Sequence, residues 1–142
     1  LSSVVALSFF IPLLIGTGGN AGSQTTSTII RALAVGEIDL GDAMRSLWHE
    51  LRVGFLLGIG MGVIAYFRAL TWGSSSGLAI TVSMAIFTIV LWANGLGALL
   101  PILAAKLKID PKVVSGPVMS TLVDATGLFI YFTVARIVLG LW

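Results

Sequence analysis

Long apolar runs that carry almost no charge are the feature that most constrains this chain. A helix needs roughly 20 largely apolar residues to cross a bilayer, and segments 4–30, 53–70, 78–105 and 113–136 meet that requirement. Only 10% of the residues are charged, whereas a soluble domain is usually about a quarter charged. We therefore predict an all-α polytopic transmembrane helix bundle with four spans, filling residues 1–142 as one domain.

The connectors between these spans also carry patterns. In Gly36–Arg52, apolar residues recur at helical spacing, at Leu40, Met44, Leu47, Trp48 and Leu51. This predicts an amphipathic helix that lies at the membrane interface and runs into the second span, with Asp39 as its N-cap and Asp42 at the third position. In Lys106–Lys112, Asp110 is expected to cap the fourth span, with Pro111 at its first position.

The basic residues predict the orientation of the bundle. One side carries Arg31, Arg45, Arg52, Lys106, Lys108 and Lys112, and the other carries only Arg68 and Arg136. The positive-inside rule makes the first side cytoplasmic, so connectors 36–52 and 106–112 are expected in the cytoplasm. Both ends of the chain then face outward, which leads us to expect a further span before Leu1.

Some functions are excluded at this stage. The chain has no cysteine, so disulfides, thiolate metal sites and thiol catalysis are not available. The net charge is only +2 and the basic residues are dispersed, so we expect no nucleic-acid partner. The expected surroundings are a lipid bilayer.

Asp124 is the one acidic residue that lies deep in an apolar span. An aspartate at the centre of a membrane helix costs about 2.5–3.5 kcal/mol, and such residues usually serve a function. No basic residue lies at a comparable depth in the sequence. A protonated Asp124 hydrogen-bonded to a neighbouring helix is one interpretation, and we favour the other, in which it faces water and a cation.

The residues around Asp124 support that interpretation. Helical spacing places Gly116, Ser120, Asp124 and Gly127 on one small, polar face. Pro117 has no backbone N–H, so we expect it to leave a carbonyl free near Val113. Free carbonyls inside a membrane are tolerated where they line water, and they can bind hard cations.

The first span repeats this small and polar character. Gly16, Gly19, Ser23 and Ser27 share one face, and Asn20, Gln24 and Thr28 extend it on the adjacent side. Small residues and hydroxyls also pack membrane helices together, which is sufficient to explain the glycines alone. For the whole run GTGGNAGSQTTST we favour a pore lining.

The remaining motifs predict packing. Gly54, Gly58 and Gly62 form GxxxGxxxG, a close-packing face. Asn94 suits either a path lining or a tie between helices. Tyr131 and the tryptophans are expected in the core or at the membrane interface. His49, in the first connector, is expected to be solvated or to contact lipid headgroups.

One carboxylate and a few carbonyls favour an ion that keeps its water. Mg²⁺ dehydrates reluctantly and usually retains several waters, whereas Ca²⁺ takes 6–8 oxygen ligands. A two-fold dimer, the commonest closed symmetry, would set two Asp124 side chains about one axis with a divalent ion between them. We therefore expect a homodimer.

Three long motifs resemble the MgtE family of magnesium channels. They are PLLIGTGGNAGSQTTSTIIRALAVGEIDLGD (12–42), LWANGLGALLPILAAKLKIDPKVVSGP (91–117) and STLVDATGLFIYFTVAR (120–136). The resemblance implies a homodimeric Mg²⁺ channel of the bacterial inner membrane with five helices per subunit, of which the first is missing here. It also implies a cytoplasmic N-terminal domain and CBS domains, neither of which these residues contain.

The resemblance also implies the site residues. Asp124 would bind hydrated Mg²⁺, assisted by the backbone carbonyl of Ser120, with Gly116 as a further metal-site residue. The cytoplasmic half of the pore would be lined by Gly16, Gly19, Ser23, Ser27, Val113 and Gly116. Ser23 and Gly116 depart from the family pattern, in which amide side chains are frequent at both positions.

Other functions remain to be weighed. A secondary transporter could use Asp124 as a proton or Na⁺ coupling site. An intramembrane protease is a remote alternative, because aspartyl types need a second acid and serine types need a histidine at membrane depth. A structural membrane subunit leaves the burial of Asp124 without a reason. We therefore expect a transporter rather than an enzyme.

Overall fold

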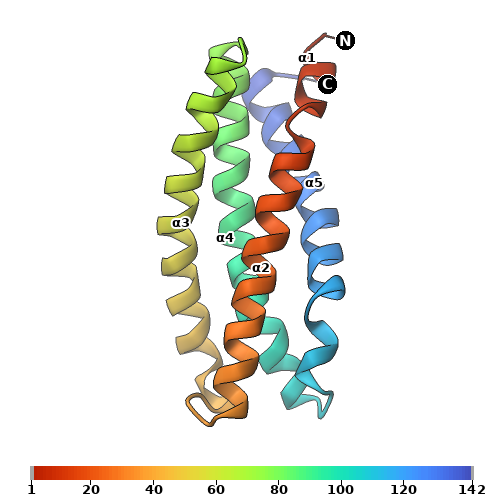
Figure 1. Ribbon diagram of the computed structural model, residues 1–142. Helices are drawn as coiled ribbons and strands as arrows, with labels where there is room; N and C mark the ends of the chain where they lie inside the picture. Colours follow the sequence, from red (N-terminus) through yellow and green to blue (C-terminus); the bar gives the residue numbers. More distant parts are fainter. Residues whose placement is uncertain (1, 142) are drawn as a thin grey trace.

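A computed structural model describes residues 2–141, which form helices joined by short turns and contain no strand (Figure 1). The predicted all-α class is therefore confirmed for the described residues. The elements in chain order are α1 (Ser2–Ser8), α2 (Ile11–Ala34), the 3₁₀ turn η1 (Leu40–Asp42), α3 (Ala43–Thr71), α4 (Ser76–Lys106), the 3₁₀ turn η2 (Pro111–Val114) and α5 (Pro117–Leu139).

Four helical segments are long and apolar enough to cross a membrane. They are Ser2–Ala34, Leu40–Thr71, Ser76–Lys106 and Pro117–Leu139. The shortest has 23 residues, which at 1.5 Å per residue gives about 35 Å, more than the roughly 30 Å of a hydrocarbon core. The four spans read from the sequence thus correspond to four helical segments of sufficient length.

The first segment is broken near its N-terminus. Its helix stops at Ser8 and restarts at Ile11, with Pro12 in the first turn of α2. Pro12 has no N–H to donate to the carbonyl of Ser8, so a continuous helix would lose a hydrogen bond there. The first predicted span, 4–30, therefore corresponds to one helical segment with a break between Ser8 and Ile11.

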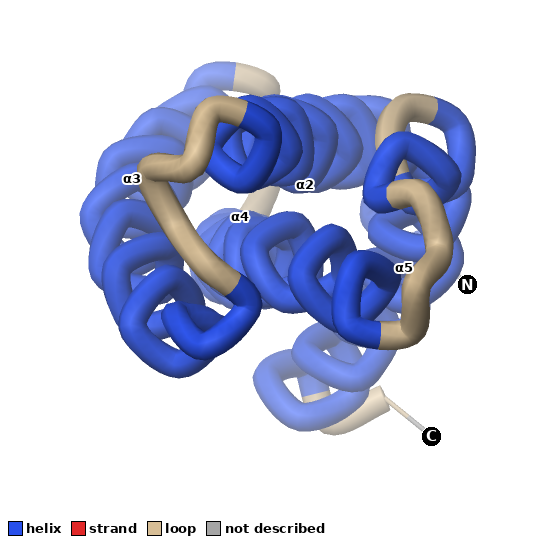
Figure 2. The backbone as a smooth tube through the Cα atoms, turned by 90° about the horizontal axis from the view of Figure 1, so that it is seen from below, coloured by secondary structure: helices blue, strands red, loops and turns tan. Residues whose placement is uncertain are grey.

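Helix α4 is the centre of the bundle. It packs against α2, α3 and α5, and α5 also packs against α2, while α3 packs mainly on α4 (Figure 2). The burial of side chains follows this arrangement, since α4 contributes four fully buried aliphatic residues, Val82, Ile86, Val90 and Ile102. Tyr131 of α5 is also fully buried and donates a hydrogen bond of 2.8 Å to the carbonyl of Leu7, as expected for a core aromatic.

Small residues let α3 approach α4 closely. Methyl groups added at Gly54, Gly58 and Gly62 would lie 3.0–3.2 Å from atoms of α4. At the last of these glycines, the hydroxyl of Ser83 donates to the carbonyl of Gly62 at 2.8 Å. The predicted role of GxxxGxxxG as a close-packing face is confirmed.

The first connector continues into the second span, as predicted. Asp42 Oδ2 accepts a hydrogen bond of 2.8 Å from the backbone N–H of Asp39, as expected for this helix start. The amphipathic segment runs into the span without a break, because α3 is continuous from Ala43 to Thr71. Its inward face carries the buried Ser46 and Glu50, while Met44 and Trp48 are exposed.

The last connector differs from its prediction. Asp110 accepts from the backbone N–H of Lys112 at 3.0 Å and therefore caps η2 rather than the spanning helix. Helix α5 begins only at Pro117, at a position where the missing N–H has no partner to lose. The predicted start of the span at Val113 is therefore wrong, and Pro117 begins the helix rather than interrupting it.

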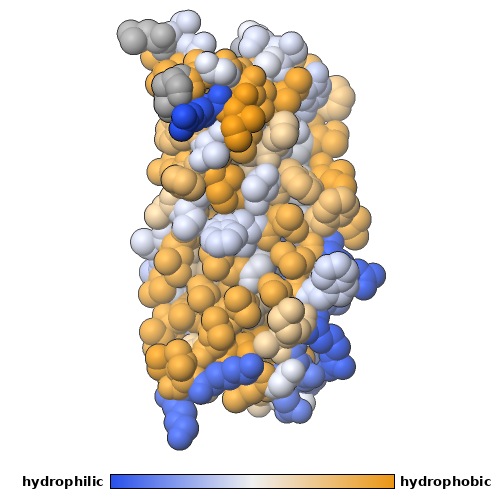
Figure 3. All heavy atoms as spheres, turned by 180° about the vertical axis from the view of Figure 1, so that it is seen from behind, coloured by the Kyte–Doolittle hydropathy of each residue, from blue (hydrophilic) through white to orange (hydrophobic). Residues whose placement is uncertain are grey.

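The two ends of the bundle differ in polarity. Connectors 35–42 and 107–116 lie at one end, and both described ends of the chain lie at the other, beside the turn at Trp72–Ser75 (Figure 1). Hydrophilic residues gather mainly at the connector end, and apolar residues cover most of the height between (Figure 3). The two connectors thus lie at the same end of the bundle, as the alternating direction of the four predicted spans requires.

Replacing Gly97 by alanine should destabilise the bundle. The added methyl would lie 2.8 Å from the carbonyl oxygen of Gly22 and 2.9 Å from Cβ of Thr25. Overpacking of this kind costs about 1–3 kcal/mol, so the thermal unfolding midpoint in detergent should fall. Gly60→Ala is the matched control, because nothing lies within 4 Å of its added methyl. Equal midpoints for the two variants would contradict the close contact between α2 and α4.

Candidate ion site

Four of the predicted site residues meet where α2 packs on α5. The hydroxyls of Ser23 and Ser120 lie 3.3 Å apart. A methyl added at Gly19 would lie 3.4 Å from Asp124 Oδ1 and 3.8 Å from Ser120 Oγ. We call these four residues, Gly19, Ser23, Ser120 and Asp124, the α2–α5 seam.

The other predicted lining residues lie on α2 or in the segment that precedes α5. Gly16 faces open space one turn from Gly19, and Ser27 donates its hydroxyl to the carbonyl of Ser23 at 2.9 Å. Val113 is exposed in η2. Gly116 precedes α5 with a φ of 53°, and its carbonyl accepts from the backbone N–H of Ser120 at 2.9 Å. No described contact joins Val113 or Gly116 to the carboxylate.

Gly127 does not belong to this face. It is buried, and a methyl added there would lie 3.7 Å from Ile89 of α4. Helical spacing alone grouped it with Ser120 and Asp124, but α4 covers this part of α5. The polar stripe predicted on α5 therefore ends one turn earlier than expected.

Asp124 is half-buried and is surrounded by small and hydroxyl-bearing residues. Within residues 2–141, the ion pairs are Asp42 with Arg45 at 3.2 Å and Glu50 with His49 at 3.2 Å, so none involves Asp124. Among the described residues, no basic side chain therefore competes with a cation for this carboxylate. The sequence prediction of an unpaired acid in this span agrees with the described contacts.

One chain provides only one wall of an ion site. The seam is partly exposed, and no three His, Cys, Asp or Glu side chains gather anywhere in residues 2–141. Such a wall can contact a hydrated cation through one carboxylate and neighbouring hydroxyls. It cannot replace the ion's water shell, which for Mg²⁺ is retained in most protein sites.

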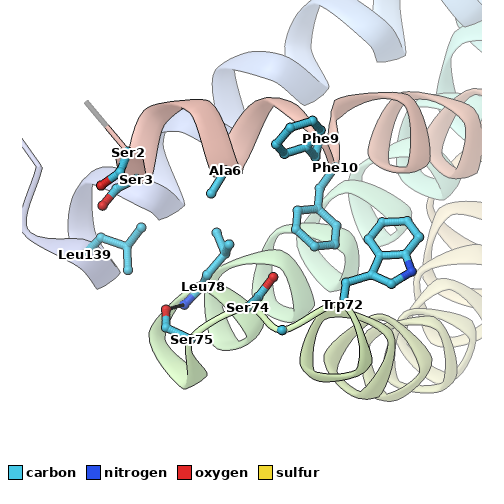
Figure 4. A pocket seen from close by; sticks show the side chains of 11 residues that line it. Ser2, Ser3, Ala6, Phe9, Phe10, Trp72, Ser74, Ser75, Leu78 and Leu139 are labelled. Carbon is cyan, nitrogen blue, oxygen red and sulfur yellow. Dashed lines mark hydrogen bonds between the residues drawn. The ribbon is translucent and has the colours of Figure 1, made fainter.

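A cavity of about 780 Å³ lies at the opposite end of the bundle from the connectors (Figure 4). Its wall includes the rings of Phe10 and Trp72, whose centroids are 5.5 Å apart and whose planes are tilted by 33°, together with Ser74 and Ser75 of the adjoining turn. Among the described residues, its lining contains no carboxylate or basic side chain.

The sequence analysis missed one buried acid. Glu50 was assigned to the connector, but in α3 it is only 9% exposed. It borders a polar cavity of about 320 Å³ whose wall also includes Gln24, Thr28, His49 and Asn94. A usable signal was present, because Glu50 precedes Gly54, Gly58 and Gly62 at a constant spacing of four residues. That spacing places it on the face that packs against α4.

Two open expectations are decided in the same region. Asn94 is 2% exposed, and its side-chain N–H donates to the carbonyl of Glu50 at 3.4 Å, so it ties α4 to α3. The His49 side chain is 70% exposed. This agrees with the expectation that His49 is solvated.

The fold and the seam together define a class of protein. It is a polytopic helical membrane protein that keeps an unpaired carboxylate beside hydroxyls on a partly open helix face. Such intramembrane acids mark ion pathways and proton relays.

Comparison with known proteins identifies the family. The MgtE family model, described as a divalent cation transporter, matches residues 11–134. The magnesium transporter MgtE of Thermus thermophilus is 43% identical over 139 residues, which cover 98% of this chain and 31% of that protein. The MgtE proteins of Bacillus subtilis and Enterococcus faecalis are 33% and 34% identical over 95% and 94% of this chain, each over 30% of the relative. The chain belongs to the MgtE family and spans about a third of the length of these relatives.

The geometry of the seam predicts a disulfide. Cβ of Ser120 lies 4.0 Å from a Cβ built on Gly19, within the roughly 3.5–4.5 Å that disulfides require. Oxidation of a Gly19→Cys/Ser120→Cys double variant should therefore close an intramolecular bridge in this cysteine-free chain. Loss of both free thiols without a dimer-sized band on a non-reducing gel would show it. Gly16→Cys/Ser120→Cys is the control and should keep its thiols, because Gly16 has no neighbour within 4 Å.

Proposed function

We propose that this chain is the transmembrane pore domain of a Mg²⁺ channel of the bacterial inner membrane. The observation that carries the proposal is the unpaired carboxylate of Asp124 beside Ser120, on a partly open face between two membrane helices. The family membership and the magnesium-transporter relatives support the choice of ion. Mg²⁺ is then both the transported ion and the ligand of Asp124.

The sparse donor set favours a hydrated ion. Mg²⁺ prefers oxygen ligands, binds proteins through one or two carboxylates and keeps several waters. Asp124 would hold such an ion through its waters, with the Ser120 carbonyl and Gly116 assisting. An ion held this way is bound weakly enough to leave again, which conduction requires.

A homodimer would complete the site. The α2–α5 seam is a single wall, so a second copy related by a two-fold axis would supply the opposite one. Two Asp124 carboxylates about that axis would repel each other unless a cation lay between them, and a divalent ion would neutralise the pair. Gly16, Gly19, Ser23, Ser27 and Val113 would then line the connector half of the pathway.

The topology completes the proposal. We place connectors 36–52 and 106–112 in the cytoplasm, because six of the eight basic residues lie at that end. The relatives are about three times as long as this chain, which is consistent with a further helix and with cytoplasmic domains that regulate the pore.

A proton- or Na⁺-coupled secondary transporter would use Asp124 as its coupling site. Flux that depends on voltage alone, with no proton or Na⁺ gradient, would favour the channel. A protease is not supported, since no second acid or histidine lies with Asp124 in the described residues. We therefore propose a transport protein rather than an enzyme.

Asp124→Ala and Asp124→Asn should each reduce Mg²⁺ flux at least tenfold, because either change removes the charge that attracts the ion. Flux into proteoliposomes, driven by voltage alone with no proton or Na⁺ gradient, is the measurement. Glu37→Gln removes one exposed acid elsewhere and should leave flux unchanged. Full flux in both Asp124 variants would end the proposal, and flux that requires a proton or Na⁺ gradient would favour the coupled transporter.

Cross-linking tests the dimer separately. In this cysteine-free chain, Asp124→Cys should be joined to its counterpart in the second copy by a bis-methanethiosulfonate reagent about as long as a hydrated ion. The product is a dimer band in membranes before solubilisation. Leu56→Cys, which is exposed on α3 away from the seam, should give no such band. Cross-linking of Leu56→Cys alone would place the two-fold axis elsewhere.

A further inference from the structure

An open-sided cavity lies on the side of α2 away from the seam, and its lining includes the buried Glu50 and Asn94 and the exposed Gln24 and Thr28. Its volume is about 320 Å³, and its wall combines α2, α3 and α4. A second open-sided cavity of about 300 Å³ shares Thr28, His49 and Glu50 with it and continues towards the connector end. The two together form one space between α2 and α3, two helices that do not pack directly on each other over most of their length.

Glu50 supplies the negative charge of this space. Its side chain is only 12% exposed, and a buried acid needs either a partner or a bound ion. Its one described side-chain contact is the ring of His49 at 3.2 Å. That ring is 70% exposed, whereas the Glu50 side chain is largely buried.

Neutral oxygen donors complete the wall. Asn94 is held by its N–H, which donates to the Glu50 carbonyl at 3.4 Å, and its Oδ1 is buried with no hydrogen-bond partner among the described residues. Gln24 and Thr28 of α2 line the opposite side. A carboxylate, amide oxygens and a hydroxyl are the donors that hard cations prefer.

The positive groups that face this space are few. Arg45 lines the cavity that lies towards the connector end, but the Arg45 guanidinium is paired with Asp42 at 3.2 Å. Among the residues that line the two cavities, His49 is then the remaining basic side chain. Glu50 is the one acid among the residues that line the two cavities, and His49 is its described side-chain partner.

We propose that this cavity binds a hydrated divalent cation in each subunit, at a site formed by Glu50 and Asn94 with Gln24 and Thr28 opposite. The site is separate from Asp124 and does not depend on the proposed dimer. The space is large enough for an ion with retained waters, since each water takes about 30 Å³. The bound ion would bridge α2 to α3 through its waters and fix them relative to each other at the connector end.

Mg²⁺-dependent thermal stability tests the site in the purified protein in detergent. The experiment uses Asp124→Asn as the background, so that the seam cannot contribute. Saturating Mg²⁺ should raise the unfolding midpoint of this variant by about 5 °C relative to choline chloride of equal ionic strength. Adding Glu50→Gln should abolish the rise, and adding Asn94→Ala should reduce it. Adding Glu37→Gln, which removes an exposed acid near the same end, should leave it intact.

The midpoint shift is compared within each variant, so a general loss of stability in Glu50→Gln does not affect the result. A rise that persists in Glu50→Gln overturns the site, and so does the absence of any rise in the Asp124→Asn background. A rise produced by Na⁺ and not by Mg²⁺ overturns the divalent assignment. Flux through Asp124 plays no part in this measurement, so failure here leaves the proposed channel untouched.

Discussion

Close contact between glycine faces and α4 determines where everything else in this chain can lie. Inside a bilayer, helices gain little from burying apolar surface, so association depends on packing at short range. Gly54, Gly58 and Gly62 bring α3 against α4, and Gly22 and Gly97 bring α2 against the same helix. With α4 fixed between them, α2 and α3 are held apart from each other, and α5 fits against the other side of α2.

This arrangement sorts the polar groups of α2 into two separate places. Its Gly19 and Ser23 face α5 and meet Ser120 and Asp124, whereas its Gln24 and Thr28 face the cavity beside α3. The sequence shows these residues as one continuous small and polar run. Only the packing of α4 separates them, so α2 lines the seam on one side and the cavity beside α3 on the other.

The parts of the fold that depend on local chemistry could be predicted from the sequence. The length of the apolar runs predicts the four membrane-spanning segments. The constant glycine spacing predicts the α3–α4 contact, and the Asp39–Asp42 pair predicts where the helix of the first connector starts. Other features depend on tertiary contacts. Gly127 has the spacing of a pore residue but is covered by Ile89, and Pro117 begins a helix rather than interrupting one. Neither can be read from a pattern. The burial of Gly127 depends on where α4 packs, and the start of α5 depends on where η2 ends.

The carboxylates of Asp124 and Glu50 differ in a way that indicates two uses. Asp124 lies on a partly open face, has no charged partner among the described residues and lies against Gly19, with Ser120 one turn before it. Glu50 is more buried, contacts His49 and lies beside an asparagine fixed between two helices. An ion that must pass needs few ligands and an open route, while an ion that is to be retained needs several donors. On that physical ground we expect the seam to suit transit and the cavity to suit retention.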